Sequence, residues 1–214
     1  MAQNEVFDIE GPAGRLEAIL MHAEGPPVAA GVVCHAHPLQ GGIMHFKVVF
    51  RAAKALQAHG VAVLRFNFRG VGLSEGVHDE GRGEQDDVRA GLDEMQRRFP
   101  RLPIVLGGFS FGSTMALRVG VTDPRARALF ALGFPLSKVD ETAYVDECRK
   151  PRLFVQGEND AFGASEAIQH FVERLPEPRR LVVIPGGDHF FAGHLDRLQE
   201  AVSSWAAERP WEAA

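Results

Sequence analysis

The stretch that decides the fold lies at the centre of the chain and reads Ile104-Val105-Leu106-Gly107-Gly108-Phe109-Ser110-Phe111-Gly112. Its last five residues have the form G-x-S-x-G. They follow an apolar, strand-like run, and a helix-like segment, Thr114 to Val121, comes after them. This arrangement is typical of a nucleophile elbow, a strained turn that lifts a serine hydroxyl above a sheet. The flanking glycines leave room for the neighbouring strand and helix, and the helix N-terminus directs backbone N–H groups at developing negative charge. Ser110 is therefore the predicted nucleophile.

Two glycine-rich stretches partly match the motifs of nucleotide-binding loops, but each lacks a residue that its motif requires. Gly107 to Thr114 reads GGFSFGST, but a phosphate loop of the form G-x-x-x-x-G-K-[ST] requires lysine where Ser113 stands. Without that lysine no side chain reaches the β- and γ-phosphates, so a phosphate loop is not favoured. The stretch from Arg65 to Ser74 would need glycine in place of Glu75 to complete a dinucleotide fingerprint. It is predicted to be a structural turn beside the active site.

Strand-like and helix-like segments alternate along most of the chain. Apolar runs predict six strands, at 30–35, 61–68, 103–107, 127–134, 152–156 and 181–184. Apolar spacings of three and four predict helices at 46–59, 84–99, 114–121, 164–175 and 195–207. Strands that are apolar on both faces and joined by helices predict an α/β fold, with a mostly parallel central sheet and helices on both faces.

The first residues follow a different pattern. Two strand-like segments, 5–9 and 15–22, flank Gly11-Pro12-Ala13-Gly14, which predicts an N-terminal β-hairpin. No linker divides the 214 residues, and a chain of this length can bury a full core. Residues 1–214 are therefore expected to form a single domain.

A histidine near the end of the chain is the candidate base. Serine is a weak nucleophile unless a base accepts its proton and a third group orients that base. After a nucleophile elbow the order along the chain is acid, then histidine. His189 follows the last predicted strand, at the sheet edge where ligand sites of α/β folds lie. His170 lies within a predicted helix and His194 begins another, so His189 is the predicted general base.

The acid is expected in the loop after the penultimate strand, which reads Gly157-Glu158-Asn159-Asp160. Asp160 is preferred because it lies further past the end of the strand, and Glu158 is the alternative. An aspartate at this place can also cap the following helix. Asp188 is adjacent to His189 and is better suited to bracing the loop, since neighbouring side chains usually diverge.

Acyl transfer also requires N–H donors for an oxyanion. The backbone of Phe111, directly after the nucleophile, is expected to supply one of them. The second donor is expected from the loop after the first parallel strand, residues 35–42. Leu39 is preferred, with His37 and Gln40 as alternatives that the sequence does not separate.

Histidines in the same loop raise the question of a metal. His35 and His37 form H-x-H at a strand end, with His45 nearby, and residues two apart on a strand face the same way. A zinc site needs further ligands, and no carboxylate follows before Glu75. No metal and no cofactor are expected.

Composition narrows the class of partner. The net charge of −5 argues against a nucleic-acid surface, which needs a basic patch. Apolar runs are far shorter than a membrane span, and Met1 to Glu10 has neither the basic nor the apolar region of a signal peptide. The two cysteines, Cys34 and Cys148, do not suggest a disulfide framework, and Cys34 is expected in the core. These features predict a cytoplasmic protein that binds neither nucleic acid nor membrane, and they leave its oligomeric state open.

With these residues in place, the chain resembles the small bacterial serine α/β-hydrolases without a lid, near the dienelactone hydrolases and related esterases. The resemblance runs from His35-Ala36-His37-Pro38 and Asn67-Phe68-Arg69-Gly70-Val71-Gly72 through the elbow to Asp188-His189-Phe190-Phe191. It implies Ser110, Asp160 and His189 as a catalytic triad and no cofactor. Dienelactone hydrolases have a cysteine as nucleophile, so their substrate is not carried over.

The expected activity is hydrolysis of small carboxylic esters or thioesters through an acyl-enzyme intermediate. A peptidase with the same triad and a non-catalytic binding protein of the same fold are the alternatives, because fold does not fix function.

No cap domain is expected over the site. Lids in this fold are commonly inserted before the strand at 152–156, and here only Pro135 to Pro151 is available, enough for one helix at 138–149. So short a segment cannot bury a core of its own. Ser110 is therefore expected in an open groove edged by four aromatic rings, those of Phe111, Phe134, Phe162 and Phe190.

Overall fold

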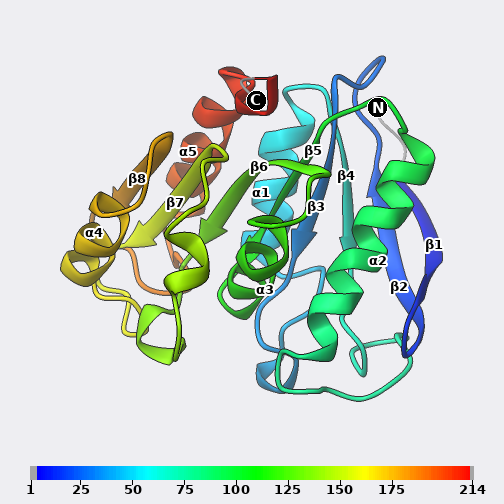
Figure 1. The fold of residues 1–214 in the computed structure, drawn as a ribbon, viewed down its shortest axis with the longest axis horizontal. Coiled ribbons are helices and arrows are strands. Elements are labelled where there is room, and N and C mark those ends of the chain that lie inside the picture. Colours follow the sequence, from blue (N-terminus) through cyan, green and yellow to red (C-terminus); the bar gives the residue numbers. More distant parts are fainter. Residues whose placement is uncertain (1–3, 213–214) are drawn as a thin grey trace.

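The protein is built around one eight-stranded sheet in the order β1-β2-β4-β3-β5-β6-β7-β8 (Figure 1). The structure is a computed structural model and describes residues 4–212. The strands are β1 (Asn4–Gly11), β2 (Gly14–Met21), β3 (Ala29–Cys34), β4 (Val61–Phe66), β5 (Ile104–Phe109), β6 (Ala126–Leu132), β7 (Arg152–Gly157) and β8 (Arg179–Ile184).

The pairing of the strands confirms the expected topology. β1 and β2 form the N-terminal hairpin, and β2 pairs antiparallel with β4. The strands from β3 to β8 pair with their neighbours in parallel. The sheet is therefore mostly parallel, with its antiparallel part at the N-terminal edge.

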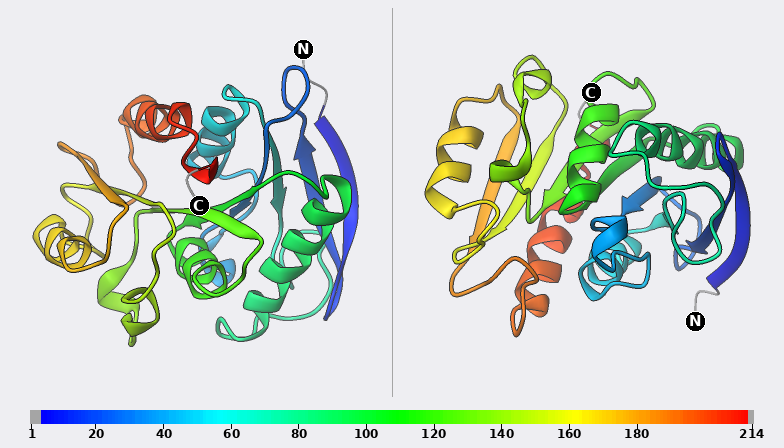
Figure 2. Two further views of the ribbon diagram at one scale, coloured as in Figure 1. Left: turned by 45° about the horizontal axis from the view of Figure 1, so that its top comes forward. Right: turned by 90° about the horizontal axis from the view of Figure 1, so that it is seen from below.

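Helices cover both faces of the sheet (Figure 2). They are α1 (Lys47–Gln57), α2 (Gly83–Arg98), α3 (Phe111–Gly120), α4 (Ser165–Glu173) and α5 (Leu195–Ala207). α1 and α5 pack against one face, and α2, α3 and α4 pack against the other. Within residues 4–212, no helix is both long and apolar enough to cross a lipid bilayer.

The sheet has one hydrophobic core on each face, and alternate residues of the central strands point into the two cores. In β3, Val32 and Cys34 belong to the core under α2 and α3, whereas Val33 belongs to the core under α1 and α5. In β5, Leu106 and Val105 divide in the same way. This alternation follows from the two-residue period of a strand and explains why the strands are apolar on both faces. Cys34 is a buried free thiol, as expected.

The segment between β6 and β7 differs from the prediction of one helix at 138–149. It contains two single 3-10 turns, Leu136–Lys138 and Ala143–Val145. Val139 and Tyr144 are partly buried against the core, and Val145 is fully buried. β-branched and aromatic residues are poor helix formers, so this packing decides the conformation. The segment forms no cap domain.

Candidate active site

Ser110 occupies a strained turn between β5 and α3. Its φ is 54° and its ψ is −120°, a conformation that non-glycine residues rarely adopt. The Ser110 N–H donates to Leu132 O of the neighbouring strand at 2.9 Å, and Ser110 O accepts from the Ser113 hydroxyl at 2.6 Å. These bonds hold the turn so that its hydroxyl lies at the carboxyl edge of the sheet.

The glycines on either side of Ser110 permit the close approach that this turn requires. A Cβ atom on Gly108 would lie 2.6 Å from the backbone of Gly112. A Cβ atom on Gly112 would lie 2.3 Å from His35 O and 2.5 Å from Cys34 O. Both contacts involve backbone atoms of packed elements, so side chains at these positions would push α3 away from the end of β3.

Gly112→Ala is expected to lower the free energy of unfolding by about 3 kcal/mol or more, because an overpacked core must shift backbone. Urea unfolding followed by circular dichroism measures this change. Gly91→Ala is the matched control, since its Cβ would meet only side chains at 3.4 Å or beyond and alanine favours a helix interior. Equal stability of the two variants would contradict the close-approach argument.

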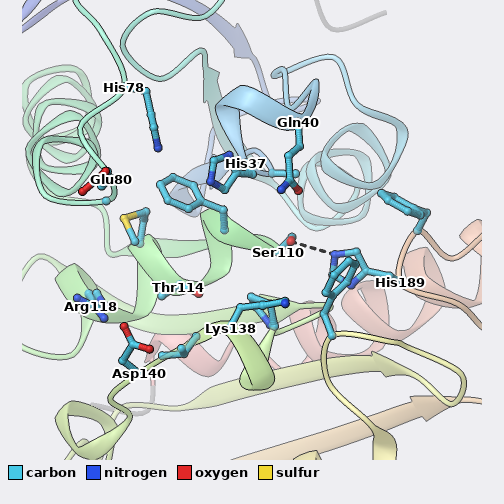
Figure 3. Close-up of a pocket in the computed structure, with 18 residues that line it drawn as sticks. His37, Gln40, His78, Glu80, Ser110, Thr114, Arg118, Lys138, Asp140 and His189 are labelled. Carbon is cyan, nitrogen blue, oxygen red and sulfur yellow. Dashed lines mark hydrogen bonds between the residues drawn. The ribbon is translucent and has the colours of Figure 1, made fainter.

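His189 lies in the loop between β8 and α5, and its imidazole reaches Ser110 (Figure 3). The distance from His189 Nε2 to Ser110 Oγ is 2.9 Å. The histidine is largely buried, with its ring 5.1 Å from that of Phe109 and 4.6 Å from that of Phe162. These contacts fix the ring so that its second nitrogen points away from Ser110.

Asp160, in the loop after β7, holds that second nitrogen. Its Oδ2 lies 2.8 Å from His189 Nδ1, and its Oδ1 accepts the N–H of Phe162 at 2.8 Å. The buried Gln156 also donates to Asp160 Oδ2, at 2.8 Å. The carboxylate is therefore fixed by three donors, and the three side chains from three loops form one hydrogen-bonded chain.

Gln156 is a residue that the sequence analysis did not single out. Its Nε2 also donates to Gly163 O at 2.9 Å, and its Oε1 accepts the N–H of Phe134 at 2.9 Å. With both ends of its amide engaged, Gln156 has one fixed orientation. It holds the loop that carries Asp160 against the loop after β6.

The alternative candidates for the acid and the base do not bond to Ser110 or His189. Glu158 accepts the N–H of Gly186 through Oε2, and Asp188 accepts the N–H of Ala192 through Oδ1, so Asp188 braces its loop as expected. His170 is exposed in the last turn of α4, and His194 precedes α5. Within residues 4–212, none of these four side chains forms a hydrogen bond with Ser110 or His189.

Two backbone N–H groups beside Ser110 are unpaired. Phe111 is the first residue of α3, and within residues 4–212 its N–H has no acceptor. In the loop after β3 the Leu39 N–H donates to His37 Nδ1 at 3.2 Å, and the Gln40 N–H donates to His37 O at 3.0 Å. Because the Leu39 N–H is engaged by His37 Nδ1 and Leu39 does not line the pocket, the structure does not support Leu39 as a donor. The N–H of His37 has no acceptor in the described chain.

His35 is a structural residue. Its Nδ1 lies 2.7 Å from Ala36 O, and its Nε2 accepts the N–H of Phe68 at 3.0 Å. Burial lowers the pKa of His35 to about 4. The Nε2 bond joins the end of β3 to the segment after β4, and with Nδ1 on Ala36 O neither ring nitrogen is left for a metal.

A pocket of about 560 Å³ opens over Ser110 and His189 (Figure 3). Phe111, Phe162 and Phe190 line it, in agreement with the expected groove. The expectation for Phe134 is wrong, because its ring is fully buried in the core and stacks on Phe171 with centroids 5.6 Å apart. The adjacent Pro135 lines the pocket in its place.

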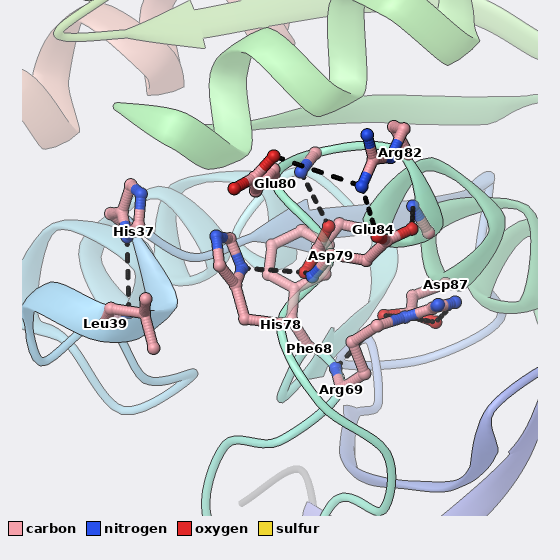
Figure 4. Close-up of polar contacts among 12 residues, drawn as sticks. His37, Leu39, Phe68, Arg69, His78, Asp79, Glu80, Arg82, Glu84 and Asp87 are labelled. Atoms are coloured by element: carbon pink, nitrogen blue, oxygen red, sulfur yellow. Dashed lines mark hydrogen bonds and ion pairs between the residues drawn. The ribbon is translucent and has the colours of Figure 1, made fainter.

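One wall of the pocket carries a second group of titratable side chains that no sequence motif indicated (Figure 4). His78 Nδ1 lies 2.8 Å from Oε1 of the fully buried Glu84. Glu84 also accepts the N–H groups of Asp79 and Gly81 at 2.8 Å each. The His37 ring lies 5.0 Å from that of His78, and burial together with this neighbour lowers the pKa of His37.

The sequence matches the α/β-hydrolase domain family over residues 28–207. It is also 33% identical to an uncharacterised protein of Rickettsia prowazekii, over 91% of this chain and 85% of the relative.

Solved structures share the architecture closely. An α/β serine hydrolase homologue from Coxiella burnetii is 37% identical, with a TM-score of 0.89 over 95% of this chain and 98% of that one. A Xanthomonas campestris protein, described as an α/β serine hydrolase without a lid, is 32% identical, with a TM-score of 0.88 over 97% and 94% of the two chains. The expected resemblance to hydrolases of this type is confirmed.

Proposed function

Because the chain belongs to the α/β-hydrolase domain family, we propose that it is a serine hydrolase that cleaves small carboxylic esters or thioesters through an acyl-enzyme intermediate. The observation that carries this proposal is the hydrogen-bonded chain from Ser110 through His189 to Asp160. It places a hydroxyl, a base and an orienting carboxylate in the order that nucleophilic catalysis requires.

In the proposed reaction Ser110 Oγ attacks the ester carbonyl while its proton passes to His189 Nε2. The carbon–oxygen double bond becomes an oxyanion, and the tetrahedral intermediate collapses as the alcohol leaves with the proton from His189. Water then attacks the acyl-serine while His189 takes its proton. The bond between the acyl carbon and Ser110 Oγ breaks, His189 returns the proton to Ser110, and the carboxylic acid leaves. Asp160 accepts the hydrogen bond from His189 Nδ1–H throughout and stabilises the imidazolium.

The N–H groups of Phe111 and His37 are the proposed oxyanion donors. Both are unpaired within the described chain, and both residues line the pocket beside Ser110. Unpaired donors of a fixed backbone need no reorganisation when charge develops on the carbonyl oxygen. His37 is one of the alternatives predicted in the loop after β3, and the Leu39 N–H is instead engaged by His37 Nδ1.

A fluorophosphonate probe tests the proposal. The phosphonyl group should attach to Ser110 Oγ with loss of fluoride, and mass spectrometry of the peptide should locate it. A binding protein without catalysis would remain unlabelled and would turn over no activated ester. A peptidase would label equally but would also cleave peptide amides, which an esterase would leave intact.

Because the described chain has no cap domain, we expect the enzyme to prefer esters with short acyl chains. Only two short turns separate β6 from β7, and the pocket of about 560 Å³ gives a long tail little apolar surface. We expect kcat/KM for 4-nitrophenyl butyrate to exceed that for the palmitate by about 10-fold or more, with no rate jump at a lipid–water interface. Initial rates below and above the micellar concentration check this. Preference for long-chain emulsions would reveal a covering element.

A further inference from the structure

A glutamine ends the apolar run of the strand that leads to Asp160. In β7, Leu153 and Val155 belong to the core under α1 and α5, whereas Phe154 belongs to the core on the other face. Gln156 lies two residues further along, on the same face as Phe154, and is fully buried. Removing an amide from water is unfavourable unless its polar groups are hydrogen-bonded, so the partners of Gln156 account for its place here.

The hydrogen bonds of Gln156 allow its amide only one orientation. Its Oε1 accepts the N–H of Phe134 at 2.9 Å, and its Nε2 donates to Gly163 O at 2.9 Å and to Asp160 Oδ2 at 2.8 Å. A flipped amide would set its oxygen against two acceptor oxygens and its NH2 group against an N–H donor. Gln156 therefore presents a fixed N–H to Asp160.

The N–H of Gln156 meets the same carboxylate oxygen that faces His189. Asp160 Oδ2 lies 2.8 Å from Gln156 Nε2 and 2.8 Å from His189 Nδ1. Asp160 is only 4% exposed, so water has little access to its carboxylate. Two donors that share one acceptor divide its negative charge between them. The carboxylate of Asp160 therefore attracts the Nδ1 proton less strongly than it would with His189 as the sole donor on Oδ2.

The charged side chains on the neighbouring loops have other partners. Within residues 4–212, His189 is the only basic group within 4 Å of the Asp160 carboxylate. Glu158 and Asp188 both accept backbone N–H groups of the loop after β8. The ammonium of Lys138, from the segment after β6, lies over an aromatic ring of the pocket wall, 6.0 Å from its centroid. The negative charge that His189 meets at Nδ1 is therefore set by Asp160 and the donors on that carboxylate.

We propose that Gln156 is a positioning residue for the reaction: it holds Asp160 against His189 and limits how far that carboxylate stabilises the imidazolium. The inference rests on the proposed hydrolase function, in which His189 must be neutral to accept the proton of Ser110. Without the Gln156 donor, more of the negative charge on Oδ2 would face Nδ1. The imidazolium would then persist to a higher pH, and the acid limb of kcat/KM would move to higher pH with it.

NMR titration of the His189 imidazole, assigned by its loss in His189→Gln, tests the proposal. In Gln156→Met, which replaces the amide by an apolar chain of similar length, the midpoint should rise by about 0.5 pH unit or more. The acid limb of kcat/KM for an activated ester should rise by the same amount. Gln156→Leu should give a shift in the same direction, so the test does not depend on the folding of one variant. In the Asp160→Asn background, Gln156→Met should move the midpoint by less than about 0.2 unit, because the shared carboxylate is gone.

The matched control is Gln57→Met, which removes a second buried glutamine whose Nε2 donates to His22 O at 2.7 Å. This variant should lower the urea midpoint and leave the His189 titration and the acid limb as in the natural protein. A His189 titration that does not move in folded Gln156 variants, or that moves equally in the Asp160→Asn background, overturns the proposal. If fluorophosphonate does not label Ser110 and no ester is cleaved, the hydrolase function fails instead. The titration still decides, in that case, whether Gln156 acts on His189 through Asp160.

Discussion

Replacement of Ser110 by alanine is expected to lower kcat for activated esters by about 10⁴–10⁶-fold, to the level left by binding and the oxyanion donors alone. The hydroxyl supplies the electron pair that attacks the carbonyl, and no other hydroxyl of the described chain is hydrogen-bonded to His189. Labelling by the fluorophosphonate probe should disappear in the same variant.

The fold should survive this change, because the bonds that hold the turn are made by the Ser110 backbone. Circular dichroism and the urea midpoint of Ser110→Ala should match those of the natural protein. Ser204→Ala, which removes an exposed hydroxyl from α5, is the control and should retain full turnover. Near-normal turnover in a well-folded Ser110→Ala variant would falsify the assignment of the nucleophile.

The positions of Ser110, Asp160 and His189 could be predicted because each follows a strand that its apolar run identified. Parallel strands bring their carboxyl ends to one edge, so three loops far apart in sequence had to meet. The structure brings the three side chains within hydrogen-bonding distance, and their catalytic roles stay predictions. The limits of the strands and helices shifted by a few residues, as is usual where ends are set by hydrogen bonds.

The errors concern residues whose direction depends on a local turn. Leu39 was preferred as a donor, but the His37 side chain accepts its N–H, an interaction that no periodicity encodes. Phe134 was placed in the groove, but Gly133 has φ of 52° and turns the chain immediately before it, and the ring packs on Phe171 in the core. His78 belongs to no motif and reaches the pocket only because a long loop folds back beside α3.

Asp160→Asn is expected to lower kcat by about 10³–10⁴-fold, which makes it the second largest effect. The carboxylate accepts from Phe162 N–H on Oδ1 and from Gln156 Nε2 and His189 Nδ1 on Oδ2. An amide has only one oxygen, so its NH2 must face a donor whichever way it turns. If the NH2 faces His189, it favours the tautomer with the proton on Nε2, and that nitrogen can no longer accept the proton of Ser110.

Glu158→Gln is the matched control for this variant, because it makes the same chemical change two residues earlier in the same loop. Within residues 4–212, Glu158 accepts only the Gly186 N–H, and a glutamine oxygen can accept that bond equally well, so kcat should change by less than about 3-fold. Steady-state rates on one activated ester, with urea midpoints for both variants, separate loss of chemistry from loss of structure. A larger loss in Glu158→Gln than in Asp160→Asn would assign the acid to Glu158. In that case the bond between His189 Nδ1 and Asp160 would have only a structural role.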